Sequence, residues 1–563
     1  MNATYTYDHY YRYGEITEIL QKYAAEYPNL VRLNSLGRTP EGRDIWMVEL
    51  TDTATGSFED KPAHCVTANI HAGEVTGTMC AMYFLDYLLT NSDEPEVRSL
   101  LGKYTVYVIP RITPDGAECY LTTPESLRSV NRMYPYNELM PGLQPRDMDG
   151  DGVIRRMRIK SPFGIWKVSP EDPRVMVKRA PDETEGDFYN VYTEGEILDY
   201  DGINIKSAPN KWGNDFNRNF PLTWVPEAVQ PGGGTYPMCN VETRSLTDFI
   251  VGHPNLCTIV NMHTMSGFYL YPPATKSRKE APKADMERYK TIGKMATEET
   301  TYPVISIHDE YCPVDSNDVY GSFDDFTHFA RGLFDYTIEL WDLNPRAGIP
   351  FVFPTPSEIP DEQQAEESIK YLRWIDEHND GQGFLNWTRF QHPQLGEVEI
   401  GGIDYKTVVQ NCPAKYLPQE VEKHTRFMLR EMKTLPLLKI GKVNVEHIDG
   451  SAYRVDAYVM NTGYFPTYVT QEALNLKIVR DIEATLSGEG ITFVEGKPKQ
   501  LLGQLEGFSG IAGFSGGEGA ISFEQAPCEK KVTWIIKAAP GSKLTVSAVS
   551  ERAGRAAAEV VLP

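Results

Sequence analysis

Two apolar runs that lie far apart in the chain each end on a histidine. Residues 65–70 (CVTANI) precede His71, and residues 256–262 (LCTIVNM) precede His263. Short continuous apolar runs of this kind are consistent with strands that are buried on both faces of a sheet. In a sheet covered by helices, ligands bind beyond the carboxyl ends of the strands. The pattern therefore predicts an α/β fold with both histidines at the edge where such a fold builds its sites.

A carboxylate completes the set of candidate metal ligands. Glu74 follows His71 by three residues and opens the helix-like stretch 74–89. Two histidines and a carboxylate match the protein ligands of a catalytic zinc site, which leaves one position open for water. A lone His-x-x-Glu can equally be a solvated helix start, so its sequence context decides between the two interpretations.

Further segments supply that context. They are residues 36–45 (LGRTPEGRDI), 113–116 (TPDG), 215–220 (DFNRNF), 263–267 (HTMSG) and 336–340 (YTIEL). In this order and at these intervals they resemble the zinc carboxypeptidase (M14) family, over roughly residues 5–430. The resemblance implies a zinc metallocarboxypeptidase that hydrolyses the C-terminal peptide bond of peptides or proteins, with zinc held by His71, Glu74 and His263.

The resemblance also implies two catalytic side chains. Glu339 matches the general base, and a carboxylate within an otherwise apolar strand is costly to bury unless it has a role. Arg128 falls at the position of the arginine that stabilises the oxyanion, and Arg132 is its rival for that position. Gly73 stands where many family members carry an arginine.

Substrate recognition follows from the same resemblance. Asn217 and Arg218 match the pair that binds the terminal carboxylate, which a planar guanidinium can hold with two hydrogen bonds. Tyr320 matches the tyrosine that covers the bound C-terminal residue. Asp324 matches the pocket position where an aspartate favours basic C-terminal side chains, so a preference for lysine and arginine is expected.

The patterns along the chain predict two domains. The first ~130 residues alternate helical and strand-like periods, as in a mixed, mostly parallel sheet flanked by helices. Residues 1–435 would form the catalytic domain, with an insertion at about 140–212 where proline, glycine and charged residues interrupt the pattern. Residues 436–563 contain short alternating runs between glycine-rich turns such as 508–519, which predicts a β-sandwich accessory domain.

The composition and charge limit the classes of function that this chain can have. The chain has 563 residues, a hydrophobic content of 41% and a net charge of -23. These values allow a sizeable core and disfavour nucleic acid as a partner, because phosphates require a basic surface. No apolar stretch is long enough to span a bilayer, and residues 1–8 lack the features of a signal peptide. The eight scattered cysteines define no framework, and compartment and oligomeric state are left open.

A calcium loop is a separate hypothesis. Asp147, Asp149 and Asp151 alternate before Gly152, as at the start of an EF-hand loop. The closing glutamate of such a loop would fall at position 158, which is Arg158. An ordinary turn network of aspartate and glycine is the competing interpretation.

Three alternative functions remain. A zinc amidohydrolase acting on a non-protein amide, such as a peptidoglycan stem peptide or an N-acyl amino acid, would keep the same metal ligands and base. A non-catalytic binding protein on a hydrolase fold would be expected to have lost at least one of them. A calcium-dependent adhesion module would rest on the aspartate loop only.

Overall fold

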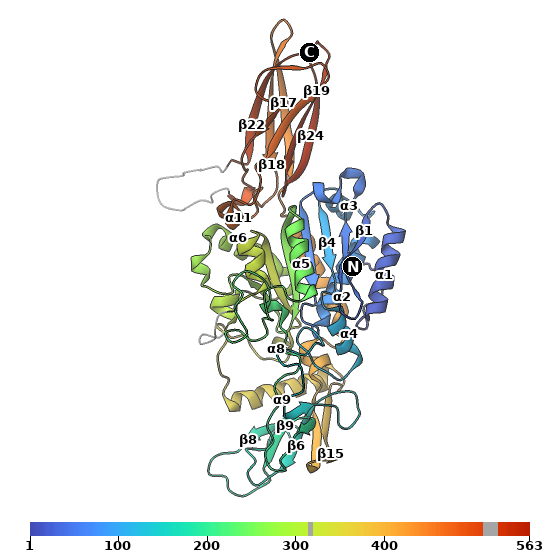
Figure 1. Ribbon diagram of the computed structural model, residues 1–563, viewed down its shortest axis with the longest axis vertical. Helices are drawn as coiled ribbons and strands as arrows, with labels where there is room; N and C mark the ends of the chain where they lie inside the picture. Colours follow the sequence, from blue (N-terminus) through green and yellow to red (C-terminus); the bar gives the residue numbers. More distant parts are fainter. Residues whose placement is uncertain (313–318, 511–526) are drawn as a thin grey trace.

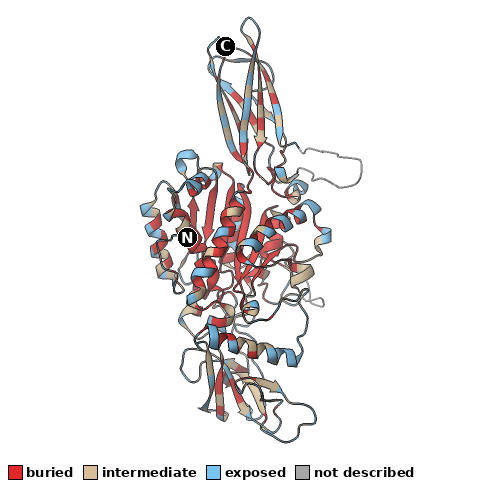
Figure 2. Ribbon diagram, turned by 180° about the vertical axis from the view of Figure 1, so that it is seen from behind, coloured by how far each residue is buried: buried red, intermediate tan, exposed pale blue. Residues whose placement is uncertain are grey.

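The computed structural model describes residues 1–312, 319–510 and 527–563. Figure 1 shows a central α/β body with a β-sandwich at one end of the long axis and a smaller sheet at the other. Burial is concentrated in the central body, as Figure 2 shows. The large core that the composition allows is therefore built mainly around one sheet.

An eight-stranded sheet, in the order β1-β2-β4-β3-β11-β14-β12-β13, forms the centre of this body. Its four middle strands run parallel to one another. They are β4 (Thr105–Ile109), β3 (Ala63–Ala68), β11 (Leu256–Thr264) and β14 (Phe334–Leu340). Every residue in them is buried, which explains why they read as continuous apolar runs rather than as alternating ones.

The outer strands make the sheet mixed. β2 (Asp44–Leu50) is antiparallel to β4, and β1 (Val31–Arg38) is antiparallel to β2. On the other side, β12 (Phe268–Tyr271) is antiparallel to β14, and β13 (Val304–Ser306) is parallel to β12. The predicted class, a mixed and mostly parallel sheet flanked by helices, is confirmed.

Helices cover both faces of this sheet. One face packs in a single cluster with α1 (Tyr13–Glu26), α2 (Val75–Thr90), α6 (Lys283–Thr300) and α10 (Leu417–Met432). The other face packs against α5 (Val241–Gly252), whose Leu246 and Phe249 share a cluster with Cys65 and Ile259 of the sheet. α3 (Pro95–Leu101) and α4 (Pro114–Thr122) lie on the connections around β4.

The segment predicted as an insertion contains strands of its own. β5 (Gly142–Pro145) pairs with β10 (Gly195–Leu198). A six-stranded sheet then joins strands from two distant parts of the chain, in the order β15-β16-β6-β9-β7-β8. Its members are β6 (Arg156–Lys160), β7 (Trp166–Val168), β8 (Met176–Lys178), β9 (Tyr189–Thr193), β15 (Phe384–His392) and β16 (Gly396–Ile403). Because the four strands from the predicted insertion, β6 to β9, are short and largely half-exposed, their sequence lacks a clear apolar period.

Residues beyond 437 form two packed four-stranded sheets. One has the order β17-β18-β22-β20 and the other β21-β19-β23-β24. They span β17 (Leu438–Asp449), β18 (Ala452–Asn461), β19 (Glu483–Gly488), β20 (Thr492–Glu495), β21 (Lys499–Leu501), β22 (Glu529–Lys537), β23 (Lys543–Ser550) and β24 (Gly554–Val561). Burial alternates along β18, and Trp534 of one sheet and Leu486 of the other share a core, as in a sandwich. Most of the glycine-rich segment 508–519 lies outside the described residues.

Two sequence expectations concern the chain as a whole. None of the helices in the described residues has the length and apolarity that a membrane span requires. Cys65 and Cys257 are buried in β3 and β11 as small apolar side chains.

Candidate active site

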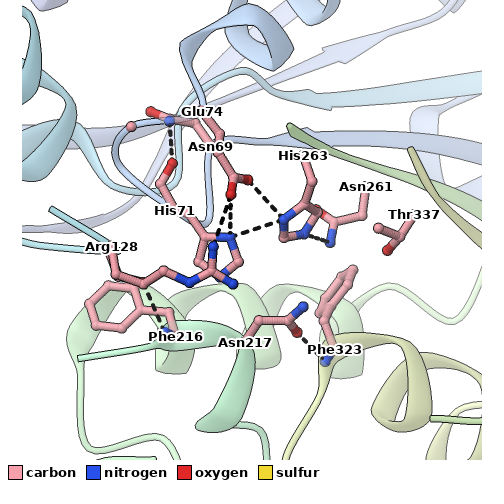
Figure 3. A network of polar contacts seen from close by, with 12 residues as sticks. Asn69, His71, Glu74, Arg128, Phe216, Asn217, Asn261, His263, Phe323 and Thr337 are labelled. Carbon is pink, nitrogen blue, oxygen red and sulfur yellow. Dashed lines mark hydrogen bonds and ion pairs between the residues drawn. The ribbon is translucent and has the colours of Figure 1, made fainter. Parts of the chain in front are cut away.

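The two histidines and Glu74 meet at the carboxyl edge of the central sheet. His71 lies just beyond β3, His263 is the second-last residue of β11, and Glu74 immediately precedes α2. Figure 3 shows their side chains converging from these three elements. β3 and β11 are parallel neighbours, and this pairing brings residues 192 positions apart into contact.

The three side chains form a tight triangle of ligand atoms. The Nδ1 atoms of His71 and His263 are 3.1 Å apart, and each is 2.9 Å from an oxygen of Glu74. All three residues are at least 98% buried. Oε2 of Glu74 has no hydrogen-bond partner among the residues that the structure describes. Electron-rich atoms that converge in this way out of contact with water require a cation between them, and the donor set suits zinc.

A polar side chain contacts the Nε2 atom of each imidazole. Nε2 of His71 lies 3.1 Å from Oδ1 of Asp215, and Nε2 of His263 lies 2.8 Å from the side-chain amide of Asn261. A hydrogen bond from Nε2 of His71 to this carboxylate leaves its Nδ1 lone pair directed at the centre of the triangle. Metal-binding histidines usually donate from their other nitrogen to such an acceptor, as His71 does to Asp215.

Arg128 forms hydrogen bonds with both Glu74 and Asp215. Its Nη1 donates to Oε1 of Glu74 and its Nε to Oδ2 of Asp215, both at 3.1 Å. Burial alone would raise the pKa of Asp215, but Arg128 and then Arg218 hold it well below its usual value. Burial likewise opposes the ionisation of Glu74, yet the neighbouring histidines lower its pKa. Both carboxylates are thus kept as anions, as ligands and their supports must be.

Glu339 lies on the strand next to that of His263. The two residues are register partners in the parallel pair β11 and β14. Burial raises the pKa of Glu339 to about 8, against the opposing effect of His263. A carboxyl group with a raised pKa beside a metal site is suited to accept and release protons.

Three predicted recognition residues lie close together beside the ligands. Asn217 and Arg218 are in the short turn Phe216–Arg218, where Oδ1 of Asn217 accepts from the backbone N–H of Phe323 at 2.7 Å. Asp324 is 97% buried, and it accepts a 2.5 Å hydrogen bond from the hydroxyl of Thr337. Burial raises the pKa of Asp324, whereas this bond and the charges of His263 and Arg218 lower it.

The two remaining candidates lie differently. Both terminal nitrogens of Arg132 donate to the fully buried Glu242 at 2.8 Å, so its guanidinium is held by a structural pair rather than by the ligand triangle. Tyr320 is half-buried next to Gly321, whose backbone packs against that of Arg218.

The aspartate loop is a separate cluster. Ligand atoms of Asp147, Asp149 and Asp151 lie within 4.8 Å of one another. Asp151 is paired with Arg155, and Arg158 packs instead over the ring of Trp387 at 4.5 Å.

Sequence reasoning did not assign four residues that border the site. Asp215 begins the segment 215–220, so its motif already contained a signal for it. The pKa of Tyr311 is raised first by the charge of Glu339 and then by burial. Gln410 and Asn411 contact the loop that carries His71 and Glu74: Nδ2 of Asn411 donates to the carbonyl of Gly73 at 2.7 Å. No signal in the sequence pointed to Tyr311, Gln410 or Asn411, because only the fold brings them here.

The departure at Gly73 has a structural reason. A Cβ atom at this position would stand 2.7 Å from Nε2 of Gln410 and 2.9 Å from the ring of Tyr120. The space that an arginine side chain would need is therefore filled by the segment that follows β16.

Comparisons with known proteins agree with this geometry. A family model described as zinc carboxypeptidase matches residues 16–368, and a second model, described as a domain of unknown function, matches residues 437–561. The first match covers more than half of the chain. The protein therefore belongs to the zinc carboxypeptidase (M14) family.

Individual relatives are distant or matched in part. A zinc carboxypeptidase of Saccharothrix mutabilis subsp. capreolus is 32% identical over 140 residues, which are 25% of this chain and 32% of that protein. Carboxypeptidase D of Mus musculus is 31% identical over 20% of this chain and 8% of its own length. Carboxypeptidase A4 of Mus musculus is 22% identical over 67% and 72% of the two chains. Among solved structures, thrombin activatable fibrinolysis inhibitor aligns with a TM-score of 0.41 at 13% identity, over 76% of this chain and 75% of that one.

Proposed function

We propose that the protein is a zinc-dependent metallocarboxypeptidase that removes the C-terminal residue of peptides or proteins. The observation that carries this proposal is the buried triangle of His71, Glu74 and His263, with the proton-accepting Glu339 on the adjacent strand. Zinc held by these three ligands would polarise the scissile carbonyl and lower the pKa of a bound water to about 7.

The other residues have roles that follow from their positions. Glu339 would accept the proton of the attacking water and pass it to the leaving amine. Arg128 would stabilise the negative charge that develops on the carbonyl oxygen, because its guanidinium borders the ligands, whereas that of Arg132 is held by Glu242. Asp215 would position His71 and Arg128 without touching the substrate.

Recognition of a free C-terminus would come from Asn217 and Arg218, which can bind a carboxylate through several hydrogen bonds. Asp324 is buried on the same side and within electrostatic reach of Arg218, which supports the expected preference for lysine or arginine. Tyr320 would cover the bound residue from its place beside Gly321.

We also propose the domain organisation expected from the sequence. Residues 1–435 would form the catalytic domain, with the insertion at about 140–212, and residues 436–563 the accessory sandwich. Within the described residues, the sheets beyond 437 share no strand with the central sheet, which supports this division. Calcium at Asp147, Asp149 and Asp151 stays a separate hypothesis, and an unchanged melting temperature on adding calcium would contradict it.

The test uses mass spectrometry on a mixed peptide pool treated with the zinc-loaded protein. We expect losses of single residues from C-termini. Glu339→Gln should keep zinc and lose most turnover, whereas His71→Ala should lose both.

The same experiment separates the alternatives. An intact pool in the presence of bound zinc would favour a non-protein amide as substrate, such as a peptidoglycan stem peptide. A chain that binds zinc and hydrolyses neither class would be a binding protein on a hydrolase fold.

A further inference from the structure

A large cavity lies between the six-stranded sheet and α9 (Asp361–His378), outside the part of the chain that places the metal ligands. Its volume is about 730 Å³, within the usual range for ligand sites. Aromatic side chains from both sides line it, and they include Trp166, Tyr371, Phe384, Trp387 and Tyr405.

The charge of this cavity is opposite to that of the protein. Arg155, Arg156 and Arg174 line it against a single acidic residue, Asp361, on a chain whose net charge is -23. Asp361 is paired with Lys178 at 2.8 Å. A basic cavity on an acidic protein attracts anionic groups selectively.

The three arginines differ in the ion pairs that they already form. Arg174 is held by Asp172 and Asp376, each at 2.8 Å. Arg155 pairs with Asp151, and its Nε is buried. Arg156 is exposed and makes no ion pair with any residue that the structure describes. The guanidinium of Arg156 is thus available to a ligand.

A single segment connects the cavity to the candidate active site. In the stretch 405–411, Tyr405 and Val409 line the cavity. Asn411 bonds to the backbone of Gly73 and Thr76 beside the metal ligands. The hydroxyl of Tyr405 also reaches Sδ of Met265, two residues after His263, at 4.0 Å.

This arrangement sets the direction of a bound peptide. Arg218 and Asp324 lie on the side of the ligands that would hold the C-terminal residue. The rest of the chain would then extend toward the cavity along Tyr405, which lines the cavity and contacts Met265. We propose that the cavity binds an acidic side chain of a peptide substrate, located upstream of the scissile bond, with Arg156 as its main ionic partner.

The inference rests on the proposed carboxypeptidase function, and it names a class of substrate for it. The carboxylate would accept charge-assisted hydrogen bonds from the guanidinium of Arg156. Its methylene stem would pack on the aromatic walls.

The test compares peptides with the same last two residues that carry glutamate or glutamine at one of the positions two to five residues before the scissile bond. We expect kcat/KM to be about tenfold higher for glutamate at the matching position. Arg156→Gln should bring the ratio close to one. Arg389→Gln is the matched control, because Arg389 is exposed on β15 of the same sheet and does not line the cavity; it should leave the ratio unchanged.

Equal rates for the two peptides in the unaltered protein, or a preference that survives Arg156→Gln, would overturn the inference while leaving the proposed function intact. If no peptide is hydrolysed, the proposed function fails instead. Fluorescence anisotropy then measures the affinities of the labelled glutamate and glutamine peptides and so tests the cavity directly. Equal affinities overturn the inference, and a tighter glutamate complex that needs Arg156 supports it.

Discussion

At position 73 only a glycine fits, because side chains from distant parts of the sequence pack against it. Its neighbours Gln410 and Tyr120 are themselves joined by a hydrogen bond of 2.9 Å, so neither moves freely. Gly73→Ala should destabilise the protein by about 1–3 kcal/mol, as overpacking does. The melting temperature and the zinc affinity measure the effect.

Shortening the opposing side chain provides the control. Gln410→Ala opens space at this contact, so the double variant should recover much of the lost stability. A double variant as unstable as the sum of its single changes would contradict a direct clash.

Asp324 is the residue that should decide between basic and apolar C-termini. Asp324→Asn should lower kcat/KM for peptides that end in lysine or arginine, relative to leucine, by on the order of tenfold or more, because a buried cation would lose its counter-charge. The neighbouring Asp325 accepts hydrogen bonds from the N–H of Ala274 and the hydroxyl of Thr275. Asp325→Asn should therefore leave the ratio unchanged, and an equal effect of both variants would refute the assignment.

At the scale of a single element, α10 carries two buried glutamates whose environments differ. Glu420 is held by Lys423 at 2.8 Å, and although burial opposes it, that charge lowers its pKa. In the described part of the chain neither oxygen of Glu431 has a hydrogen-bond partner, and burial raises the pKa of Glu431 well above the usual value. The two glutamates therefore make the free energy of unfolding depend on pH in opposite directions.

The sign for Glu431 follows from proton linkage. Above the pKa of the unfolded state, near 4.5, the native protein keeps a proton that the unfolded chain has lost. The free energy of unfolding should therefore fall as pH rises from about 4.5 toward the raised pKa. Glu431→Gln should flatten this part of the curve, as measured by denaturant unfolding between pH 5 and 8. The exposed Glu362→Gln on α9 should not, and a curve unchanged by Glu431→Gln would show that this carboxyl group does not titrate in that window.

At the scale of the whole molecule, the sandwich and the candidate active site lie at opposite edges of the central sheet. Arg552, just after β23, donates to the carbonyls of Arg331 and Gly332, immediately before β14, at 2.6 and 2.7 Å. Glu339 lies near the other end of that strand, about 20 Å away at ~3.3 Å per residue. The sandwich therefore braces the strands that position the site and does not line the site.

Removal of this contact should separate stability from catalysis. Arg552→Met leaves buried carbonyls without donors and should cost about 2 kcal/mol or more, read from the melting temperature. The value of kcat/KM for a short peptide should stay within about twofold, because the site is remote. Arg555→Met, which removes an exposed pair with Asp60, should change stability by no more than about 1 kcal/mol. A large loss of activity at an unchanged melting temperature would instead assign the sandwich a role in turnover.

The sequence by itself determined the parts that rest on local pattern. The runs 65–70 and 256–262 predicted buried strands, and these became β3 and β11, because full burial on both faces leaves a continuous apolar signal. Likewise, burial alternates along β18, as the short alternating runs of residues 436–563 led us to expect for a sandwich. The family motifs indicated the metal ligands and the base as candidates.

Only the tertiary structure decided what depends on contacts between distant segments. It placed Arg128 rather than Arg132 against Glu74, because Glu242 pairs with Arg132. It also joined residues 156–193 to 384–403 in one sheet and so formed the arginine-lined cavity. This pairing leaves no periodic trace in the sequence, because β6 to β9 are short and largely half-exposed and their partners β15 and β16 lie about 200 residues away in the chain.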